Sequence, residues 1–153
     1  ENNIATADVT DLLGERPVQM QPIDPDDPNA GQPFNILIMA SDVRDGENAE
    51  IGGAVEGMRS DTTILLHVSA DRQRVEMISI PRDSHVEIPA CDRSDGTSSN
   101  PRETRFNEAF SIGSTSGAIS DAAACTIRTV ESLTGVFVHG WLVVDFAGFI
   151  NMV

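Results

Sequence analysis

Several features that mark common protein classes are missing from this sequence. Lysine and tyrosine are absent, so all ten basic residues are arginines, whose planar guanidinium groups suit carboxylate and phosphate partners. No apolar run reaches about eighteen residues, so the sequence predicts no membrane span. A P-loop, a G-x-G-x-x-G motif and metal-type cysteine spacing are also absent, which excludes the commonest nucleotide-binding and zinc-binding motifs.

Positive charge is also scarce. The net charge is −14 and the isoelectric point is about 4.3, which argues against binding to nucleic acid or to an anionic membrane surface. The 153 residues are 40% hydrophobic, enough for one domain with its own core.

The sequence has no initial methionine and no signal peptide, and it stops just after a helix start at Asp145. We therefore expect a trimmed fragment of a longer protein.

The first 33 residues differ in composition from the rest of the chain. They hold seven acidic residues and one arginine, and they close on "QPIDPDDPNAGQP". Proline and aspartate at this density do not build a core. The sequence therefore predicts a disordered acidic linker over 1–33 and a folded domain over 34–153.

Alternating strand and helix signals follow the linker. Apolar runs predict strands at 34–40, 62–69, 74–80, 85–89 and 136–146. A helical turn is predicted at 106–113 and a long helix at 116–135, with a polar loop at 91–105 between strand and helix signals. The short polar "ADRQ" between the second and third runs fits a hairpin turn. The predicted fold class is α/β.

That hairpin has a consequence for charged residues. In an antiparallel pair, the start of the strand at 62–69 lies beside the end of the strand at 74–80. Arg59 and Asp61 of "MRSD" are therefore expected next to Arg82 and Asp83 of "SIPRD".

Two more charged residues are expected at the same edge. Asp42 and Arg44 follow the first strand, whose end must lie close by if the chain returns from it to the second strand. Carboxylates can hold a hard cation such as Mg²⁺, and arginines can bind the oxygens of a diphosphate. A site for a metal–diphosphate is therefore one interpretation, and a structural salt-bridge network at a strand edge is the other.

The two cysteines, Cys91 and Cys125, also allow two interpretations. In an exported protein a disulfide between them would close a long loop and add roughly 4 kcal/mol of stability in the loop-entropy model. The alternative is two free buried thiols. The sequence favours the disulfide.

Five segments resemble, in order, the LytR–CpsA–Psr (LCP) family of cell-wall glycopolymer ligases. They are "NILIMASDVRDG", "MRSDTTILLHVS", "VEMISIPRDSHVEIP", "RFNEAF" and "TVESLTGVFVHGWLVVDFAGFINMV". The resemblance implies a domain with a mixed β-sheet packed between helices. This chain would hold the N-terminal part of that domain. It also implies a phosphotransferase that moves a glycopolymer from a polyprenyl-diphosphate carrier to peptidoglycan or a wall protein, with Mg²⁺ as cofactor.

The resemblance also implies roles for individual residues. Asp42 and Asp61 match metal ligands, and Arg59 and Arg82 match diphosphate-binding arginines. Further matches to family motifs, as substrate-binding, catalytic or neighbouring residues, are Arg44, Thr62, Asp83, Arg105 and Asn107. Asp83 is a candidate base, although a metal-bound carboxylate is an alternative. The apolar strand positions could line a slot for the polyprenyl chain or simply pack in the core.

Some features depart from the family pattern. "ASD" stands where the family usually has "GSD", the loop between the two aspartates is long, and the later half of the domain is absent. The resemblance implies a protein on the outer face of the cytoplasmic membrane, held by an N-terminal helix that this sequence lacks. Two other functions stay open, namely a non-catalytic module that binds polyprenyl diphosphates or wall glycan, and a lipid diphosphatase.

Overall fold

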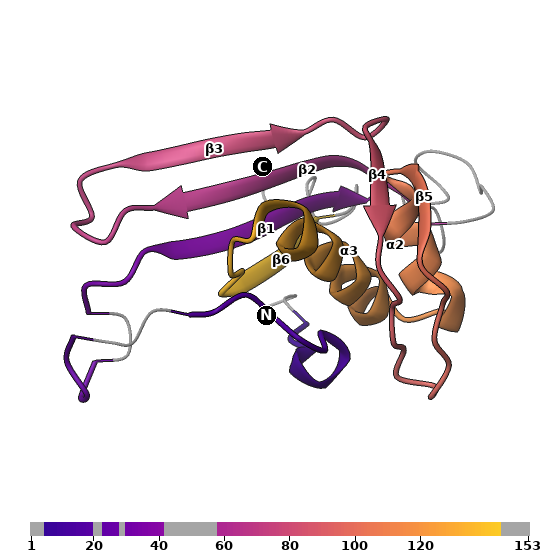
Figure 1. Cartoon of the computed structure of the whole chain (residues 1–153), viewed down its shortest axis with the longest axis horizontal. Helices are drawn as coiled ribbons and strands as arrows, with labels where there is room; N and C mark the ends of the chain where they lie inside the picture. The colour runs from indigo at the N-terminus through magenta and orange to yellow at the C-terminus, as the bar shows by residue number, and fades with distance from the viewer. Residues whose placement is uncertain (1–4, 20–22, 28–29, 42–57, 145–153) are drawn as a thin grey trace.

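The structure, a computed structural model, describes residues 5–19, 23–27, 30–41 and 58–144 (Figure 1). Within these ranges, no helix is long and apolar enough to cross a membrane. The regular elements are η1 (Thr10–Leu12), β1 (Phe34–Ser41), β2 (Ser60–Val68), β3 (Val75–Ile80), β4 (His85–Ile88), β5 (Arg102–Arg105), α2 (Glu108–Gly113), η2 (Ser114–Ser116), α3 (Ile119–Thr134) and β6 (Gly140–Val144).

The larger sheet has the strand order β3-β2-β1-β6. β1 pairs antiparallel with β2, and β2 with β3, whereas β6 runs parallel to β1 on its other side. The apolar runs predicted the first three strands to within two residues at each end, and the β2–β3 hairpin is confirmed. The mixed sheet and two helices confirm the α/β fold class.

The two faces of the sheet are buried to different extents. Along β1 every second residue is buried, and Leu37 and Met39 are completely inaccessible, whereas the residues between them are only half-buried. Leu37, Met39 and Leu65 belong to the same buried cluster as Phe106, Phe110 and the apolar residues of α3. The inward positions of β1 and β2 therefore form the core, as expected from strand alternation.

Helix α3 presents small residues to that core. Ala122, Ala123 and Ala124 are at most 1% exposed, and Thr126 and Thr129 are buried beside them. The two threonine hydroxyls donate to the carbonyls of Ala122 and Cys125, one turn earlier, so they carry no unsatisfied hydrogen bond into the core. Gly135 ends the helix with a φ of 69°, a left-handed conformation that glycine adopts readily.

One predicted loop contains a strand. Residues 102–105 were assigned to the polar loop 91–105, but they form β5, which pairs antiparallel with β4 in the register His85↔Arg105 and Ile88↔Arg102. "RETR" has no apolar alternation, and three of its four residues are exposed. The strand forms because its backbone pairs with β4, so hydrophobic periodicity gave no signal for it.

The first part of the predicted linker is also ordered. Val9 and Leu13 on either side of η1 are 5% and 3% exposed and join the core, and η1 packs against α3. Arg16 forms an ion pair with Glu131 of α3 at 2.6 Å. The prediction of a disordered segment is therefore wrong for residues 5–19. The average composition of the 33 residues gave no signal for the burial of Val9 and Leu13 or for the ion pair of Arg16.

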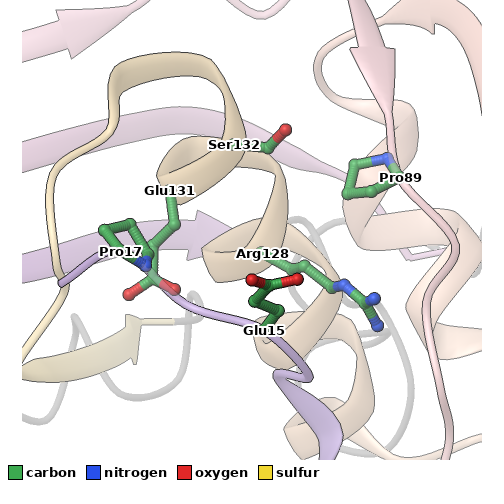
Figure 2. A pocket seen from close by; sticks show the side chains of 6 residues that line it. All are labelled: Glu15, Pro17, Pro89, Arg128, Glu131 and Ser132. Carbon is green, nitrogen blue, oxygen red and sulfur yellow. The ribbon is translucent and has the colours of Figure 1, made fainter.

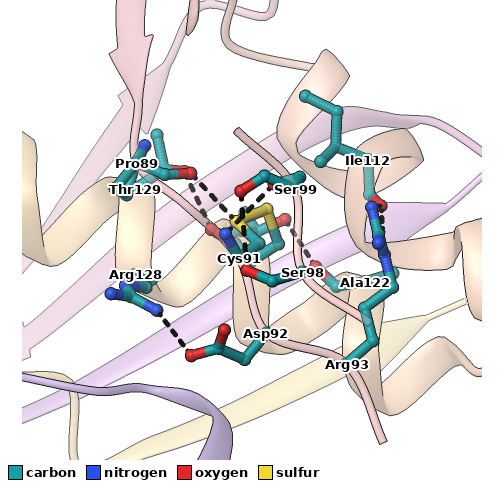
Figure 3. Close-up of a disulfide and its surroundings, with 12 residues drawn as sticks. Pro89, Cys91, Asp92, Arg93, Ser98, Ser99, Ile112, Ala122, Arg128 and Thr129 are labelled. Carbon is teal, nitrogen blue, oxygen red and sulfur yellow. Dashed lines mark hydrogen bonds and ion pairs between the residues drawn. A yellow bond between two sulfur atoms is a disulfide. The ribbon is translucent and has the colours of Figure 1, made fainter. Parts of the chain in front are cut away.

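Cys91 and Cys125 form the predicted disulfide, which joins the segment after β4 to the middle of α3 (Figure 3). The neighbouring loop is held by further hydrogen bonds. The Oγ atom of Ser99 accepts from the backbone N–H of Cys91 at 3.1 Å, and the Arg93 guanidinium donates to the carbonyl of Ile112. The loop 91–101 is therefore fixed to both helices.

Candidate functional site

The candidate site lies at the edge of the sheet where β1 and β6 end. Because these strands are parallel, their carboxyl ends meet at one edge, a common position for ligand sites in α/β proteins. Ser41 at the end of β1 pairs with Ser60 at the start of β2, and Ile80 at the end of β3 pairs with Thr63. Chain segments that are distant in sequence therefore meet here.

Asp61 occupies a β-bulge at this edge. Ala40 pairs with Thr62 but the next residue, Ser41, pairs with Ser60, so Asp61 is the extra residue on β2. The bulge interrupts the alternation of buried and exposed residues, because Ser60 and Thr63 are buried while the two residues between them are both exposed. Bulges re-aim side chains and are frequent next to active sites. Here the bulge turns Asp61 toward solvent at the edge of the sheet.

Arg82 reaches Asp61 from a turn that follows β3. The N–H of Ser84 donates to the carbonyl of Pro81 at 3.1 Å and closes the turn around Arg82 and Asp83. Nη1 of Arg82 donates to Oδ1 of Asp61 at 2.8 Å, and Nε of Arg82 lies 3.6 Å from Oδ2 of Asp83. The hairpin therefore brings these three predicted residues together.

Two more charged groups extend this cluster through β5 and α2. Nη1 of Arg105 lies 4.0 Å from Oδ1 of Asp83, and Nη2 of Arg105 lies 3.4 Å from Oε1 of Glu108. We call Asp61, Arg82, Asp83, Arg105 and Glu108 the charged rim. Charges of opposite sign alternate along it. Glu108 was not predicted as a site residue, although it lies in the segment "RFNEAF" directly after Asn107.

The charged rim influences the protonation of Arg82. The hydrogen bond that Arg82 donates to Asp61, followed by the charges of Asp61 and Asp83, raises the pKa of Arg82 above its ordinary value. Arg82 therefore stays cationic at any physiological pH. A permanent cation beside carboxylates suits an anionic ligand that arrives with a divalent metal.

The other predicted residues take different positions. Arg59 and Thr62 are exposed beside Asp61. Asn107 is only 6% exposed; its N–H donates to the carbonyl of Arg82 at 3.0 Å, and its side-chain Oδ1 has no hydrogen-bond partner among the described residues. Asp42 and Arg44 lie outside the described residues. Ser41, which directly precedes Asp42 in the sequence, is paired at this edge.

The chemistry of the donors bears on whether a metal fits here. Residues 5–19, 23–27, 30–41 and 58–144 contain no group of three acidic, histidine or cysteine side chains that could enclose a metal. Asp61 binds Arg82 through Oδ1, and its side chain is 43% exposed, so the carboxylate is accessible from water. An open site with one or two carboxylates suits Mg²⁺, which keeps several waters and bridges phosphate oxygens. The residues present fit this metal.

A pocket of about 300 Å³ lies elsewhere, between the N-terminal segment, the end of β4 and α3 (Figure 2). Its lining consists of Glu15, Pro17, Pro89, Arg128, Glu131 and Ser132. No member of the charged rim lines this pocket, and Arg128 already pairs with Asp92 at 3.2 Å. It is therefore separate from the candidate site.

Comparisons with known proteins identify relatives of this chain. The LytR_cpsA_psr family model matches residues 2–153. The polyisoprenyl-teichoic acid–peptidoglycan teichoic acid transferase TagU of Halalkalibacterium halodurans is 30% identical over 83% of this chain and 34% of its own length. The probable cell wall biosynthesis protein LcpB of Corynebacterium glutamicum is 28% identical over 78% of this chain and 26% of its own.

A solved structure shares the fold. TagT bound to LIIa-WTA superposes with a TM-score of 0.57 and 24% identity, covering 92% of this chain and 42% of that one. The chain thus spans about a third of the length of the curated relatives it matches. The family match covers almost the whole sequence, including every residue of the charged rim, and the chain belongs to the LytR–CpsA–Psr family.

Proposed function

We propose that this chain is part of a Mg²⁺-dependent phosphotransferase that moves a glycopolymer from a polyprenyl-diphosphate carrier to a cell-wall acceptor. The observation that carries the proposal is the ion pair between Arg82 and Asp61 on a bulge at the carboxyl edge of the sheet. Family membership and the teichoic acid transferase activity for which the TagU relatives are named support the same reaction.

The small contribution of this ion pair to stability favours a functional reason for its presence. Arg82 and Asp61 are 53% and 43% exposed, and an ion pair this exposed adds about 0–1 kcal/mol to stability. Asp83 and Arg105 are more than half exposed as well. A bulge and a turn that together position such weakly stabilising charges are better explained by ligand binding than by folding.

We assign the parts of the site as follows. Asp61, with Asp42 from the sequence motif, would hold Mg²⁺, which supplies positive charge against the diphosphate when bound. Arg82 and Arg59 bind the remaining diphosphate oxygens, and Arg105 extends this cationic surface along the charged rim. The exposed guanidinium of Arg82 can keep one hydrogen bond to Asp61 while its other N–H groups face the ligand.

In the proposed reaction, a hydroxyl of the acceptor attacks the phosphorus that carries the glycan. A new P–O bond forms to the acceptor, the bond to the bridging oxygen breaks, and polyprenyl phosphate leaves with the electron pair. Asp83 is the candidate base for the hydroxyl proton, because its carboxylate is 65% exposed and lies on the charged rim. A metal-bound carboxylate is the alternative base. Arg59 and Arg82 stabilise the charge that develops on the phosphoryl oxygens.

We place this reaction outside the cytoplasmic membrane. The disulfide between Cys91 and Cys125 supports that location, because disulfides persist in oxidising surroundings and are rare in the cytosol. The acceptor on this side would be peptidoglycan or a wall protein. The acidic net charge argues against nucleic acid as a partner.

One experiment separates this function from its two alternatives. The full-length protein is incubated with a synthetic polyprenyl-diphosphate glycan, with Mg²⁺ or EDTA, and with or without a peptidoglycan acceptor. The proposal predicts acceptor-linked glycan only when Mg²⁺ and acceptor are both present. Release of polyprenyl phosphate without acceptor, at the same rate, would instead identify a diphosphatase, and lipid binding without any product would identify a binding module.

A further inference from the structure

Asp61 is the extra residue of a bulge, so no cross-strand pairing of its own fixes its backbone. Something else must hold this residue in place if its carboxylate is to meet Arg82 reproducibly. Two serine side chains on either side of it supply the missing contacts. We propose that Ser60 and Ser111 are positioning residues that hold the segment 58–61 and thereby aim Asp61. The catalytic consequence rests on the proposed function, but the positioning itself does not.

Ser60 holds the bulge from inside the sheet. It is 2% exposed, and its Oγ lies 3.2 Å from the carbonyl of Ala40 and 3.1 Å from the carbonyl of Thr62. Its third neighbour is Oγ1 of Thr63 at 3.2 Å. The hydroxyl has one proton, which it can donate to either carbonyl, and it can accept a hydrogen bond from Thr63.

The contacts of Ser60 reach across the bulge at Asp61. Ala40 is the last regularly paired residue of β1, and Thr62 is the residue directly after the bulge on β2. One hydroxyl therefore joins both strands and both sides of Asp61. Alanine at this position would remove the hydroxyl from these partly buried contacts and so free the backbone on both sides of Asp61 to move.

Ser111 holds the same segment from the helix side. Its Oγ donates to the carbonyl of Met58 at 2.7 Å, and Met58 directly precedes Arg59. Ser111 lies on α2, which begins directly after "RFN" and carries Glu108 of the charged rim. This hydrogen bond therefore ties the segment just before β2 to α2, which carries Glu108, the partner of Arg105.

The two serines thus link the three parts of the site. Ser60 connects the end of β1 to the bulge, and Ser111 connects the start of β2 to α2. Arg82 is tied to the same α2 region through the N–H of Asn107. The distance of 2.8 Å between Arg82 and Asp61 depends on this framework as well as on the two charged residues themselves.

The first test is independent of any activity. Hydrogen exchange of the backbone amides of residues 60–63 is measured in the full-length protein without Mg²⁺, for Ser60→Ala, Ser111→Ala and the control Ser79→Ala. Ser79 is exposed on the neighbouring strand β3, and no hydrogen bond of its side chain is found among the described residues. Loss of one partly buried hydrogen bond predicts exchange about fivefold faster at 60–63, with α3 unchanged. Equal exchange in all three variants would overturn the proposal.

The second test compares transfer kinetics. A displaced Asp61 predicts that Ser60→Ala lowers kcat about tenfold and raises the Mg²⁺ concentration needed for half-maximal transfer, with little change in KM for the acceptor. Ser111→Thr keeps the hydroxyl and should restore what Ser111→Ala loses. If Asp61→Asn abolishes transfer but Ser60→Ala does not affect it, the positioning role is wrong and the proposed function stands. If Asp61→Asn transfers normally, the proposed function fails, and hydrogen exchange alone decides the positioning role.

Discussion

Arg16 of the N-terminal segment and Glu131 of α3 form a two-point ion pair, with Nη2 to Oε1 at 2.6 Å and Nε to Oε2 at 3.1 Å. Glu131 is 3% exposed, and its Oε1 also accepts from the N–H of Val138. The same guanidinium donates to the carbonyl of Val138 and stacks 3.8 Å from the ring of Phe137. One arginine therefore fastens the N-terminal segment to the helix and to the chain that enters β6.

Replacing this arginine should destabilise the protein. Arg16→Met leaves the buried carboxylate of Glu131 without its cation, and losing one partner of a buried pair costs about 3 kcal/mol. Urea unfolding measures the change in free energy. Arg74→Met is the matched control, because Arg74 is exposed beside the β2–β3 turn and the described residues give it no ion pair. Equal stability of the two variants would contradict the assigned role of Arg16.

The disulfide should stabilise the folded state by an amount comparable to the cost of losing Arg16. Its two cysteines are 34 residues apart in sequence, and closing a loop of that length stabilises the fold by about 4 kcal/mol in the chain-entropy model. Cys91→Ala/Cys125→Ala should therefore unfold at lower urea than the oxidised wild type. Dithiothreitol should lower the wild-type midpoint and leave the double variant unchanged. A wild-type midpoint that reductant does not alter would argue against a disulfide in the folded protein.

His139 should make the stability depend on pH. Its Nδ1 accepts from the backbone N–H of Asn35 at 3.1 Å, and partial burial, followed by the charge of Arg16, lowers the pKa of His139 despite an opposing effect of Glu131. The unfolded state then binds a proton at a higher pH than the folded state. This contribution to stability is present above the ordinary pKa of 6.5 and is lost as pH falls through the folded pKa.

The measurement for this prediction is the free energy of unfolding between pH 8 and pH 5. The wild type should lose stability as pH falls below about 6.5, and His139→Gln should lose less over the same range. Parallel pH profiles for the two proteins would show that the histidine does not cause the dependence.

Two arginines on β5 offer a matched test of the charged rim. Arg105 ends the strand beside Asp83, whereas Arg102 begins it at the far end, opposite Ile88. Both side chains are exposed, so neither substitution should affect folding strongly. Arg105→Ala should lower glycopolymer transfer by about tenfold or more, while Arg102→Ala should keep wild-type transfer. Equal losses would mean that general positive charge on β5 matters instead of the rim position.

Much of this fold could be predicted from the sequence where burial and periodicity coincide. The apolar runs predicted β1, β2 and β3, and the long helix predicted at 116–135 is α3. β5 was missed because its exposed charged side chains carry no periodic signal. The packed segment 5–19 was missed because Val9, Leu13 and Arg16 are sparse contacts within an acidic stretch.

Part of the candidate site could likewise be predicted from the sequence, and part could not. Antiparallel pairing was enough to predict that Asp61 and Arg82 meet, because their distance along the hairpin follows from strand geometry. The bulge at Asp61 could not be predicted, since a one-residue change in register depends on cross-strand contacts such as that of Ser60 with Ala40. Glu108 joined the cluster only because β5 and α2 fold back beside the turn that holds Asp83.

The most direct test of the central claim is the rate of Mg²⁺-dependent glycopolymer transfer by full-length Asp61→Asn. Asparagine keeps the size of the side chain on the bulge but removes the charge that pairs with Arg82 and would bind the metal. Glu76→Gln, an exposed acidic residue of β3, is the control for lost negative charge. The account predicts that Asp61→Asn loses about a hundredfold in rate while Glu76→Gln keeps the wild-type rate. A wild-type rate for Asp61→Asn would contradict it.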